Sequence, residues 1–410
     1  MNALTAETIT VARSPTSERD IPADRGAGSG TQITQAGERR SARVESLRAI
    51  AAVSVLASHA FVYGYGVSPV TVQTYWHRVF LEGGFGGVDL FYALSGYLLF
   101  WPMARSAFAT HEPVDLRRYA LNRVVRILPL YYTVLVVLLV VQNHGGSVSQ
   151  WWHFGLFAEN FSTSSIFTVD APMWTLAIEV QFYIALPLLA WLLVSLARGS
   201  RARTGLLLLG LAVASVVLYE VAATHRSPSL FIWQYSLPSV FFFFVAGMLL
   251  ALLRVGWLER PPRWLQGWAG RSDLWVAASL PLWLLACYRG TYQPVAAIAA
   301  MLIIGSCVMP LRRGAFVRLT ELRPLSRLGL SSYSLYLWQA PVLIVLAGGA
   351  VTGGGKLELI PTPAHLAKML VLGLLITVPL ALASYALIEA PPLRLRRRWA
   401  GQGGPAPSSR

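Results

Sequence analysis

Residues 235–253 read YSLPSVFFFFVAGMLLALL, nineteen consecutive positions without an acidic or basic side chain. An α-helix rises about 1.5 Å per residue, so a helix of this length reaches almost across the roughly 30 Å hydrocarbon core of a bilayer. The apolar residues also follow one another in a block and do not recur at the spacing of an amphipathic surface helix. This stretch therefore predicts a membrane-spanning helix.

Further apolar blocks lie on both sides of it, and we interpret the chain as an all-α, polytopic membrane helical bundle with about ten transmembrane helices. The composition agrees, because 55% of the 410 residues are apolar and only 13% are charged, whereas soluble domains carry charge at about a quarter of their positions. The predicted spans are residues 46–65, 84–103, 125–142, 173–195, 204–222, 235–253, 273–288, 294–310, 328–347 and 366–388.

The arginines predict the orientation of these spans. Arg39, Arg40 and Arg43 precede the first span, and alternate loops after it are rich in arginine while the loops between them carry few basic residues. The positive-inside rule then places the N- and C-termini in the cytoplasm and requires an even number of spans. The same distribution accounts for the net charge of +15 without a nucleic-acid partner. We expect a multi-pass protein of the inner or plasma membrane.

Two tails are expected to flank one membrane domain, residues 43–391. Residues 1–42 are polar and contain no apolar signal-peptide core, so we expect a disordered cytoplasmic tail. Residues 392–410 would form a basic cytoplasmic tail. The two cysteines, Cys287 and Cys307, lie inside apolar blocks, and no cluster of Cys and His has metal-ligand spacing. We therefore expect neither a disulfide framework nor a metal site.

Ionisable side chains at bilayer depth are costly and therefore indicate function. His59 is the only one of seven histidines within a predicted span, and Arg48 lies eleven residues before it. That separation is three helical turns plus about 20°, so both side chains project from one face, about 16 Å apart along the axis. Arg48 is expected near the cytoplasmic surface, where it can bind an anion. His59 is expected near the bilayer centre, where it can move a proton.

Two carboxylates and two more arginines are candidates for the same site. Asp89 in the second span and Glu179 in the fourth each lie within about two turns of the outer end, so either can face the histidine and stabilise its protonated form. Arg123 and Arg126 open the third span and share one side of it as an i, i+3 pair. Their guanidinium groups suit the phosphates of a cytoplasmic cofactor such as coenzyme A.

Each of these residues also has a purely structural explanation. Arg48 can snorkel to the interface, and Arg123 and Arg126 can be ordinary positive-inside anchors. Asp89 can be a satisfied carboxylate near the interface, and His59 can form a hydrogen bond between helices. Their combination in one chain favours a functional site.

In these segments the sequence resembles the acyltransferase-3 family of integral membrane O-acyltransferases, from about residue 43 to residue 391. One position departs from the pattern, because the ninth-span motif often continues with His where this chain has Gln339, which cannot titrate. The matching features are Arg48 with His59; Asp-Leu-Phe-Tyr-Ala-Leu-Ser-Gly from Asp89 to Gly96; Arg123-Val-Val-Arg126 followed by Ile127-Leu128-Pro129; Trp174-Thr-Leu-Ala-Ile-Glu179 followed by Phe182-Tyr183; Ser334-Leu-Tyr-Leu-Trp338; and Glu389-Ala-Pro391.

The resemblance implies an O-acyltransferase that moves an acyl group, usually from acyl-CoA, to a hydroxyl of a sugar-bearing acceptor. A cell-envelope glycan, a glycolipid and a glycosylated metabolite all fit that description. His59 would be the catalytic base, and Arg48, Arg123 and Arg126 would bind the donor. Glu179 would be a site residue of less defined role. No tightly bound cofactor is implied, and acyl-CoA enters as a substrate.

Two questions remain open. The first concerns the chemistry: either the acceptor hydroxyl attacks the thioester directly, or His59 carries the acyl group transiently. Ser95 is another candidate acyl carrier, although a hydroxyl beside Gly96 also suits helix packing. The second concerns the class of protein. A proton-coupled transporter or exporter would also use intramembrane charges, but the two halves of the chain show no repeat.

Overall fold

The computed structural model describes residues 26–66, 75–142, 145–224, 228–288, 293–349 and 360–401. The contacts divide the chain into Met1–Arg39 and a body, Arg40–Arg410, and the description below concerns the body. Helix α1 begins at Gly26, inside the segment for which the sequence predicts a disordered tail. The tail assignments stay predictions, and residues 1–25 and 402–410 lie outside the described residues.

Every regular element in the described part of the chain is helical, which confirms the all-α class. The α-helices are α1 (Gly26–Ala60), α2 (Tyr75–Arg105), α3 (Leu116–Val136), α4 (Val148–Gly155), α5 (Met173–Leu196), α6 (Arg201–Thr224), α7 (Pro228–Gln234), α8 (Leu237–Glu259), α9 (Ser272–Tyr288), α10 (Gln293–Val308), α11 (Ala315–Thr320), α12 (Arg323–Leu330), α13 (Ser332–Leu346), α14 (Pro363–Ser384) and α15 (Ala390–Gly401).

Shorter helical segments extend or connect these helices. The π-helical turns η1 (Phe61–Tyr65), η2 (Ser106–Thr110), η3 (Val137–Gln142) and η8 (Tyr385–Glu389) continue α1, α2, α3 and α14, and the 3₁₀ turns are η4 (Glu159–Phe161), η5 (Arg263–Gln266) and η6 (Trp268–Gly270).

Each predicted span coincides with a helix, and several of these helices can cross a bilayer. By length and composition, six of the described helices qualify, or seven if α12 and α13, which meet at a bend of 71°, form one broken span. The other predicted spans are α2 and the shorter apolar helices α9 and α10. A multi-span membrane protein is thus confirmed, whereas the number ten stays a prediction.

The apolar block 235–253 forms the interior of the body, as part of α8. In the apolar 18-residue stretch that qualifies this helix as a span, 72% of the stretch is buried, whereas only 17% of the corresponding stretch of α6 is buried. Phe243 and Phe244 of α8 are buried, whereas α6 exposes a row of large apolar side chains that suits contact with lipid. The exposed residues of that row include Leu206, Leu209, Val213 and Val217.

Glycines allow α2 to lie very close to its two neighbours. A Cβ atom at Gly96 would lie 2.1 Å from a carbonyl oxygen of α8, and one at Gly247 of α8 would lie 1.9 Å from the carbonyl oxygen of Ala93. On the side of α1, a Cβ atom at Gly87 would lie 2.3 Å from the carbonyl oxygen of Ala51. Small residues at such crossings permit close backbone packing, so α2 is held between α1 and α8.

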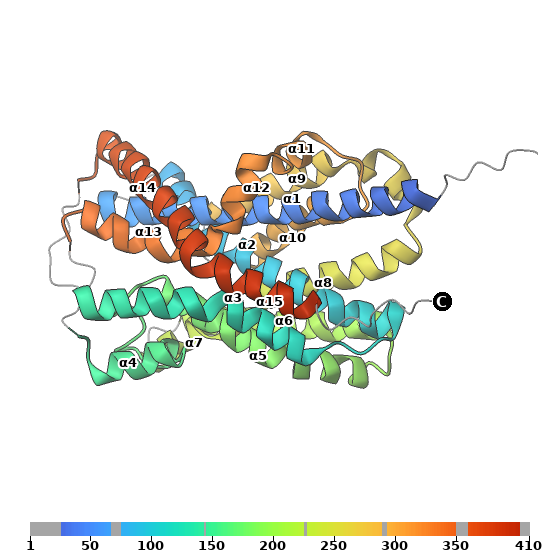
Figure 1. Cartoon of the computed structure of the whole chain (residues 1–410), viewed down its shortest axis with the longest axis horizontal. Helices are drawn as coiled ribbons and strands as arrows, with labels where there is room; N and C mark the ends of the chain where they lie inside the picture. Colours follow the sequence, from blue (N-terminus) through green and yellow to red (C-terminus); the bar gives the residue numbers. More distant parts are fainter. Residues whose placement is uncertain are drawn as a thin grey trace, which may run out of the picture. The chain divides into compact units, whose positions relative to one another are not determined.

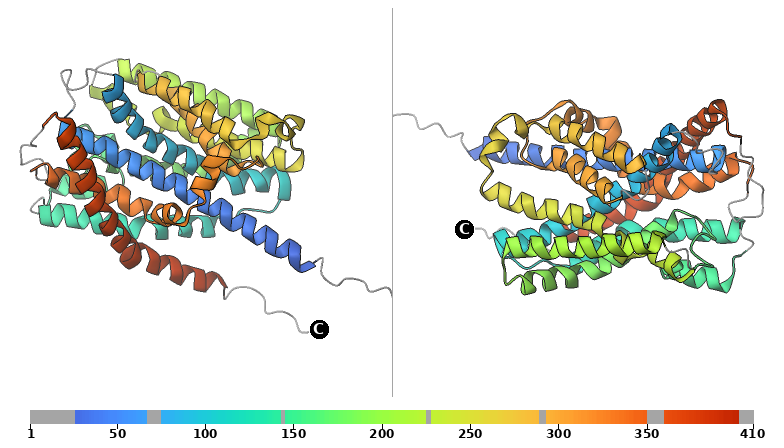
Figure 2. Two further views of the ribbon diagram at one scale, coloured as in Figure 1. Left: turned by 90° about the horizontal axis from the view of Figure 1, so that it is seen from above. Right: turned by 180° about the vertical axis from the view of Figure 1, so that it is seen from behind.

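The C-terminal end of α1 lies beside α13 and α14, which pack against each other (Figure 1). The view from above shows the same end of α1 next to the start of α14 (Figure 2). At this contact, a Cβ atom at Gly64 of η1 would lie 2.6 Å from the Cγ atom of Met369 in α14. Residues near this end of α1 therefore face α13 and α14.

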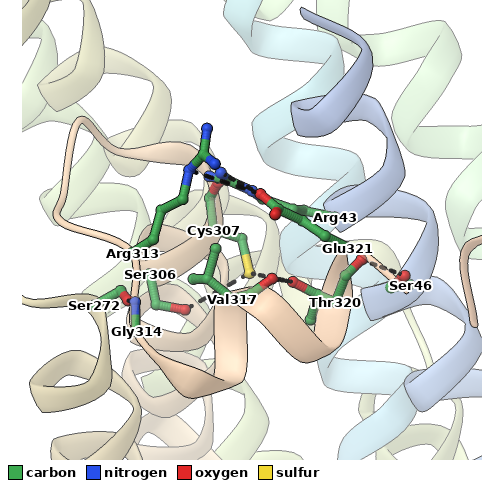
Figure 3. A network of polar contacts seen from close by, with 10 residues as sticks. All are labelled: Arg43, Ser46, Ser272, Ser306, Cys307, Arg313, Gly314, Val317, Thr320 and Glu321. Carbon is green, nitrogen blue, oxygen red and sulfur yellow. Dashed lines mark hydrogen bonds and ion pairs between the residues drawn. The ribbon is translucent and has the colours of Figure 1, made fainter. Parts of the chain in front are cut away.

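The middle of α1 is anchored to the segment between α10 and α12 by polar contacts (Figure 3). Arg43 donates hydrogen bonds to Glu321 at 2.8 and 2.6 Å, and another to the carbonyl oxygen of Cys307 at 3.1 Å. Ser46 donates a hydrogen bond to the carbonyl oxygen of Thr320 at 2.7 Å. Contacts at the middle and at the C-terminal end thus position the second half of α1.

Candidate functional site

His59 lies at the wall of a cavity of about 360 Å³, here called the His59 cavity. Its side chain is only 7% exposed. The ring of Tyr63 stacks on the imidazole with centroids 5.6 Å apart, and Phe85 presents its ring edge-on at 5.4 Å. Asp89 lines the same cavity from α2. The structure therefore brings two of the predicted site residues, His59 and Asp89, to one cavity.

The remaining wall of the His59 cavity is aromatic and acidic. Glu82 joins Asp89, and none of the described residues that line the cavity is a lysine or an arginine. Carboxylates accept hydrogen bonds from hydroxyl groups, and tyrosines both donate and accept them. Two carboxylates without a basic side chain disfavour an anion. The wall thus suits a neutral ligand rich in hydroxyls. Its aromatic members are Tyr63, Phe85, Tyr92, Phe167, Trp174, Tyr219, Tyr235, Phe243 and Tyr336.

Among the described residues, the imidazole has no carboxylate hydrogen-bond partner. Its Nδ1 atom is buried and makes no hydrogen bond among these residues. The groups beside the ring are the backbone carbonyl of Val55, one turn earlier in α1, and the side-chain amide of Gln339, from α13. The sequence suggested that Asp89 or Glu179 would bond the ring, and the structure places an amide there instead.

Arg48 lines a second, smaller cavity of about 30 Å³, here called the Arg48 cavity. Its Nε atom donates a hydrogen bond to Ser332 at 3.2 Å and lies 3.7 Å from the carboxylate of Glu45. Its guanidinium carbon lies 5.6 Å from the ring centroid of Phe91. A carboxylate, a hydroxyl and an aromatic ring thus hold this cation in place at the cavity.

Glu179 belongs to the Arg48 cavity and does not line the His59 cavity. It accepts hydrogen bonds from the hydroxyls of Ser95 at 2.8 Å and Tyr183 at 2.9 Å. Ser95 is therefore tied to this carboxylate, in agreement with a role in helix packing. Of the two carboxylates that the sequence offered as partners of His59, only Asp89 shares its cavity.

Four side chains, Val88, Tyr92, Thr175 and Tyr336, line both cavities. The hydroxyls of Thr175 and Tyr336 are hydrogen-bonded at 2.6 Å. The hydroxyl of Tyr92 is buried and has no partner among the described residues. A single layer of side chains therefore separates the two cavities. Sequence reasoning missed these residues as site members, although Tyr92, Thr175 and Tyr336 lie inside the motifs that carry the resemblance.

Arg126 is linked to the Arg48 cavity by charge. It interacts electrostatically with Arg48, and its Nη1 atom lies 3.8 Å from the carboxylate of Glu389. Glu389 is only 1% exposed and also accepts a hydrogen bond from Ser334. Glu45 and Glu389 face Arg48 and Arg126, respectively, and the guanidinium groups still offer fork-shaped donors to an anion. Glu389 was recognised in the sequence only as the end of the last span.

Arg123 reaches the same region through Tyr183. Its guanidinium carbon lies 5.8 Å from the centroid of that ring, and its buried Nε atom has no hydrogen-bond partner in the described part of the chain. The hydroxyl of Tyr183 is the one that donates to Glu179. The three arginines named from the sequence thus surround or approach the Arg48 cavity, and none of them lines the His59 cavity.

Two buried carboxylic acids lie outside the predicted spans, in the connection between α4 and α5. Burial raises the pKa of Glu159 to about 8 and raises the pKa of Asp170 well above its usual range. Neither carboxyl group has a hydrogen-bond partner among the described residues. Asp170 immediately precedes Ala171 and Pro172, which line the cavity. The sequence offered no sign of them, because they lie in a polar connection between two spans.

The described residues contain no group of three or more His, Cys, Asp or Glu side chains that could hold a metal ion.

Comparison with known proteins gives one family. The family described as "Acyltransferase domain" matches residues 41–382. The chain is 24% identical over 383 residues to the O-acetyltransferase OatA of Staphylococcus aureus (strain NCTC 8325 / PS 47). This alignment covers 85% of this chain and 56% of that protein. It is 25% identical over 333 residues to the peptidoglycan O-acetyltransferase OatA of Listeria monocytogenes, covering 73% of this chain and 49% of that protein. The chain thus spans about half the length of these relatives. No solved structure matches it.

Proposed function

The chain belongs to the acyltransferase-3 family, and from this premise we propose that it is a membrane O-acyltransferase that moves an acyl group from acyl-CoA to a hydroxyl of a sugar-bearing acceptor. The relatives' names support an acetyl group and a peptidoglycan-type glycan as the first donor and acceptor to test. The same membership favours the transferase over the transporter alternative.

One observation carries the proposal. Arg48 and His59 lie on one helix, in two cavities of opposite chemical character that share a wall of four side chains. Arg48 lines its cavity together with Glu179, and Arg123 and Arg126 lie near it, so guanidinium groups are available to a phosphate-bearing donor. The His59 cavity has carboxylates and aromatic rings, which suits a neutral acceptor rich in hydroxyls.

In the proposed reaction, the phosphates of acyl-CoA bind at the cytoplasmic side to Arg48, Arg123 and Arg126. The thioester end then passes the shared layer of side chains and reaches His59. This arrangement separates the charged part of the donor from the reacting carbon. Positioning of two reactants in this way supplies a large part of enzymatic rate acceleration.

His59 would act as the general base. The acceptor oxygen attacks the thioester carbon, its proton passes to the imidazole, a C–O bond forms and the C–S bond breaks. The proton then passes from the imidazolium to the departing thiolate, which leaves as the free thiol of coenzyme A. Asp89, in the same cavity, would stabilise the imidazolium electrostatically. Glu179 would have an indirect role, because it is hydrogen-bonded to Ser95 and Tyr183 beside the donor arginines.

The membrane arrangement that we propose has ten spans, with both termini in the cytoplasm and the acyltransferase domain at residues 43–391 flanked by two cytoplasmic tails. In a cell it would lie in the inner or plasma membrane. The arginine asymmetry of the loops and the coincidence of every predicted span with a helix support this arrangement.

The proposal is tested by acyl transfer with purified protein in lipid nanodiscs, using radiolabelled acetyl-CoA and a soluble peptidoglycan fragment. His59→Gln should reduce transfer by about 10²–10⁴-fold, because an amide hydrogen-bonds but does not take up a proton. The matched control is His153→Gln, because His153 lines neither cavity. Transfer by wild type and the control but not by His59→Gln supports the mechanism. Near-normal transfer by His59→Gln would make His59 a structural residue.

A further inference from the structure

Three buried polar atoms that have no hydrogen-bond partner among the described residues belong to two neighbouring side chains. They are Nδ1 of His59 and both amide atoms, Oε1 and Nε2, of Gln339. Gln339 is fully buried, at 0% exposure, and lies beside the imidazole. Buried polar groups are nearly always paired, and each exception requires an explanation. The backbone carbonyl of Val55 and the amide of Gln339 both lie within hydrogen-bonding reach of the imidazole.

Gln339 is a buried residue of α13. It lines neither the His59 cavity nor the Arg48 cavity, whereas His59 lines the former. Its neighbours on α13 have partners of their own: Trp338 donates a hydrogen bond to Ser384 at 2.8 Å, and Tyr336 is bonded to Thr175. The amide of Gln339 is thus the side chain of α13 that is left for His59.

We propose that Gln339 is a positioning residue for His59, with its Oε1 atom accepting a hydrogen bond from Nδ1–H. A neutral imidazole carries one proton, and the nitrogen that carries it is selected by the hydrogen bond that the ring makes. A bond at Nδ1 leaves Nε2 unprotonated and able to accept a proton in the cavity. This inference rests on the proposed function for its consequence in catalysis, but the tautomer itself is independent of it.

An amide differs from a carboxylate in this position. Both accept a hydrogen bond from Nδ1–H and orient the ring, but only a carboxylate adds a negative charge that holds the proton on the imidazolium. The base must return its proton to the leaving thiolate, and a neutral hydrogen-bond partner such as an amide permits this. The carboxyl group of Asp89 lines the same cavity as the imidazole.

The first test is spectroscopic and does not need turnover. Protein labelled with ¹⁵N-histidine is compared by solid-state NMR in lipid, and the His59→Asn variant identifies the signals of His59. Wild type should show His59 protonated at Nδ1 and unprotonated at Nε2. Gln339→Leu should show a mixture of the two tautomers. The matched control is Thr377→Val, which removes another fully buried, unpartnered polar atom from a neighbouring helix and should leave the wild-type signals.

The second test is kinetic. Gln339→Leu should lower kcat by about 10–100-fold and leave the KM values for donor and acceptor unchanged, in the range typical of residues that orient a reacting group. Gln339→His should restore most of kcat, because a neutral histidine can also accept a hydrogen bond from Nδ1–H. Thr377→Val should keep the wild-type rate.

Two results would overturn the inference. One is an unchanged His59 tautomer in Gln339→Leu, and the other is a kcat of Gln339→Leu equal to that of an active wild type. A wild type that transfers no acyl group would instead contradict the proposed function, and the spectroscopic test would still decide the role of Gln339.

Discussion

Arg126 shows how one residue serves both the structure and the proposed chemistry. It faces the buried carboxylate of Glu389 and the guanidinium of Arg48. Positive-inside anchoring alone does not require either neighbour. A second cation at this place is electrostatically unfavourable in the empty site. A bound phosphate would remove this repulsion, which is why we assign Arg126 to donor binding.

Arg126→Ala should therefore raise the KM for acyl-CoA, with little change in the KM for the acceptor. Arg126→Lys should restore affinity only in part, because lysine lacks the planar fork that binds a phosphate through two hydrogen bonds. Arg203→Ala is the matched control, because it removes an exposed arginine from another basic loop. Initial-rate kinetics on purified protein measure all three. An unchanged KM for acyl-CoA in Arg126→Ala would return this residue to the role of a topology anchor.

Glu159 predicts a pH dependence of stability. Burial raises its pKa from 4.5 to about 8, so between these values the folded protein keeps a proton that the unfolded chain has lost. The free energy of unfolding therefore falls as the pH rises through this window. Glu159→Gln should raise the thermal midpoint at pH 8 and change it little at pH 5. Glu112→Gln, at an exposed carboxylate, is the control. Equal changes of the thermal midpoint at both pH values would show that burial does not raise the pKa of Glu159.

At the scale of helices, the contact between α2 and α8 positions the site, because α2 carries Asp89, Tyr92 and Ser95 between α1 and α8. A methyl group at Gly247 would lie 1.9 Å from the carbonyl oxygen of Ala93, so Gly247→Ala must push the helices apart. We expect a loss of stability of about 1–3 kcal/mol from overpacking, and with it reduced transfer.

Gly210→Ala provides the control for this substitution. Gly210 is also inside a helix, α6, but nothing lies within 4 Å of a Cβ atom there. Alanine is a better helix former than glycine by about 1 kcal/mol, so this variant should be as stable as wild type or more stable. Thermal midpoints in one detergent compare the two. Equal midpoints for both variants would contradict the close packing of α2 and α8.

At the scale of the whole molecule, the main prediction concerns topology. Reporter fusions at residues 20 and 405 should both report the cytoplasm, because the arginine-rich loops alternate along the chain. A fusion in the connection between α3 and α5, at Ser162, should report the opposite side, since this position follows an odd number of proposed spans. Opposite readings at the two termini would require an odd number of spans and would exclude the arrangement that we propose.

The sequence alone determined the class of the protein and much of its candidate site. Apolar block length and helical periodicity are local properties, so every predicted span coincides with a helix, and Arg48 and His59 were placed on one helix face from their spacing. The family could also be recognised, because its motifs are short runs of contiguous residues such as Asp89 to Gly96. The family match over residues 41–382 confirms that recognition.

Only the tertiary structure decided which of these residues meet. The sequence offered Glu179 as a partner of His59, but the packing of α5 places it with Ser95 and Tyr183 at the Arg48 cavity. The sequence likewise did not show that Gln339 would lie beside the imidazole. The physical reason is that a helix in lipid is apolar on most of its surface. Its sequence pattern therefore does not reveal which face meets which neighbour, as an amphipathic stripe does in water.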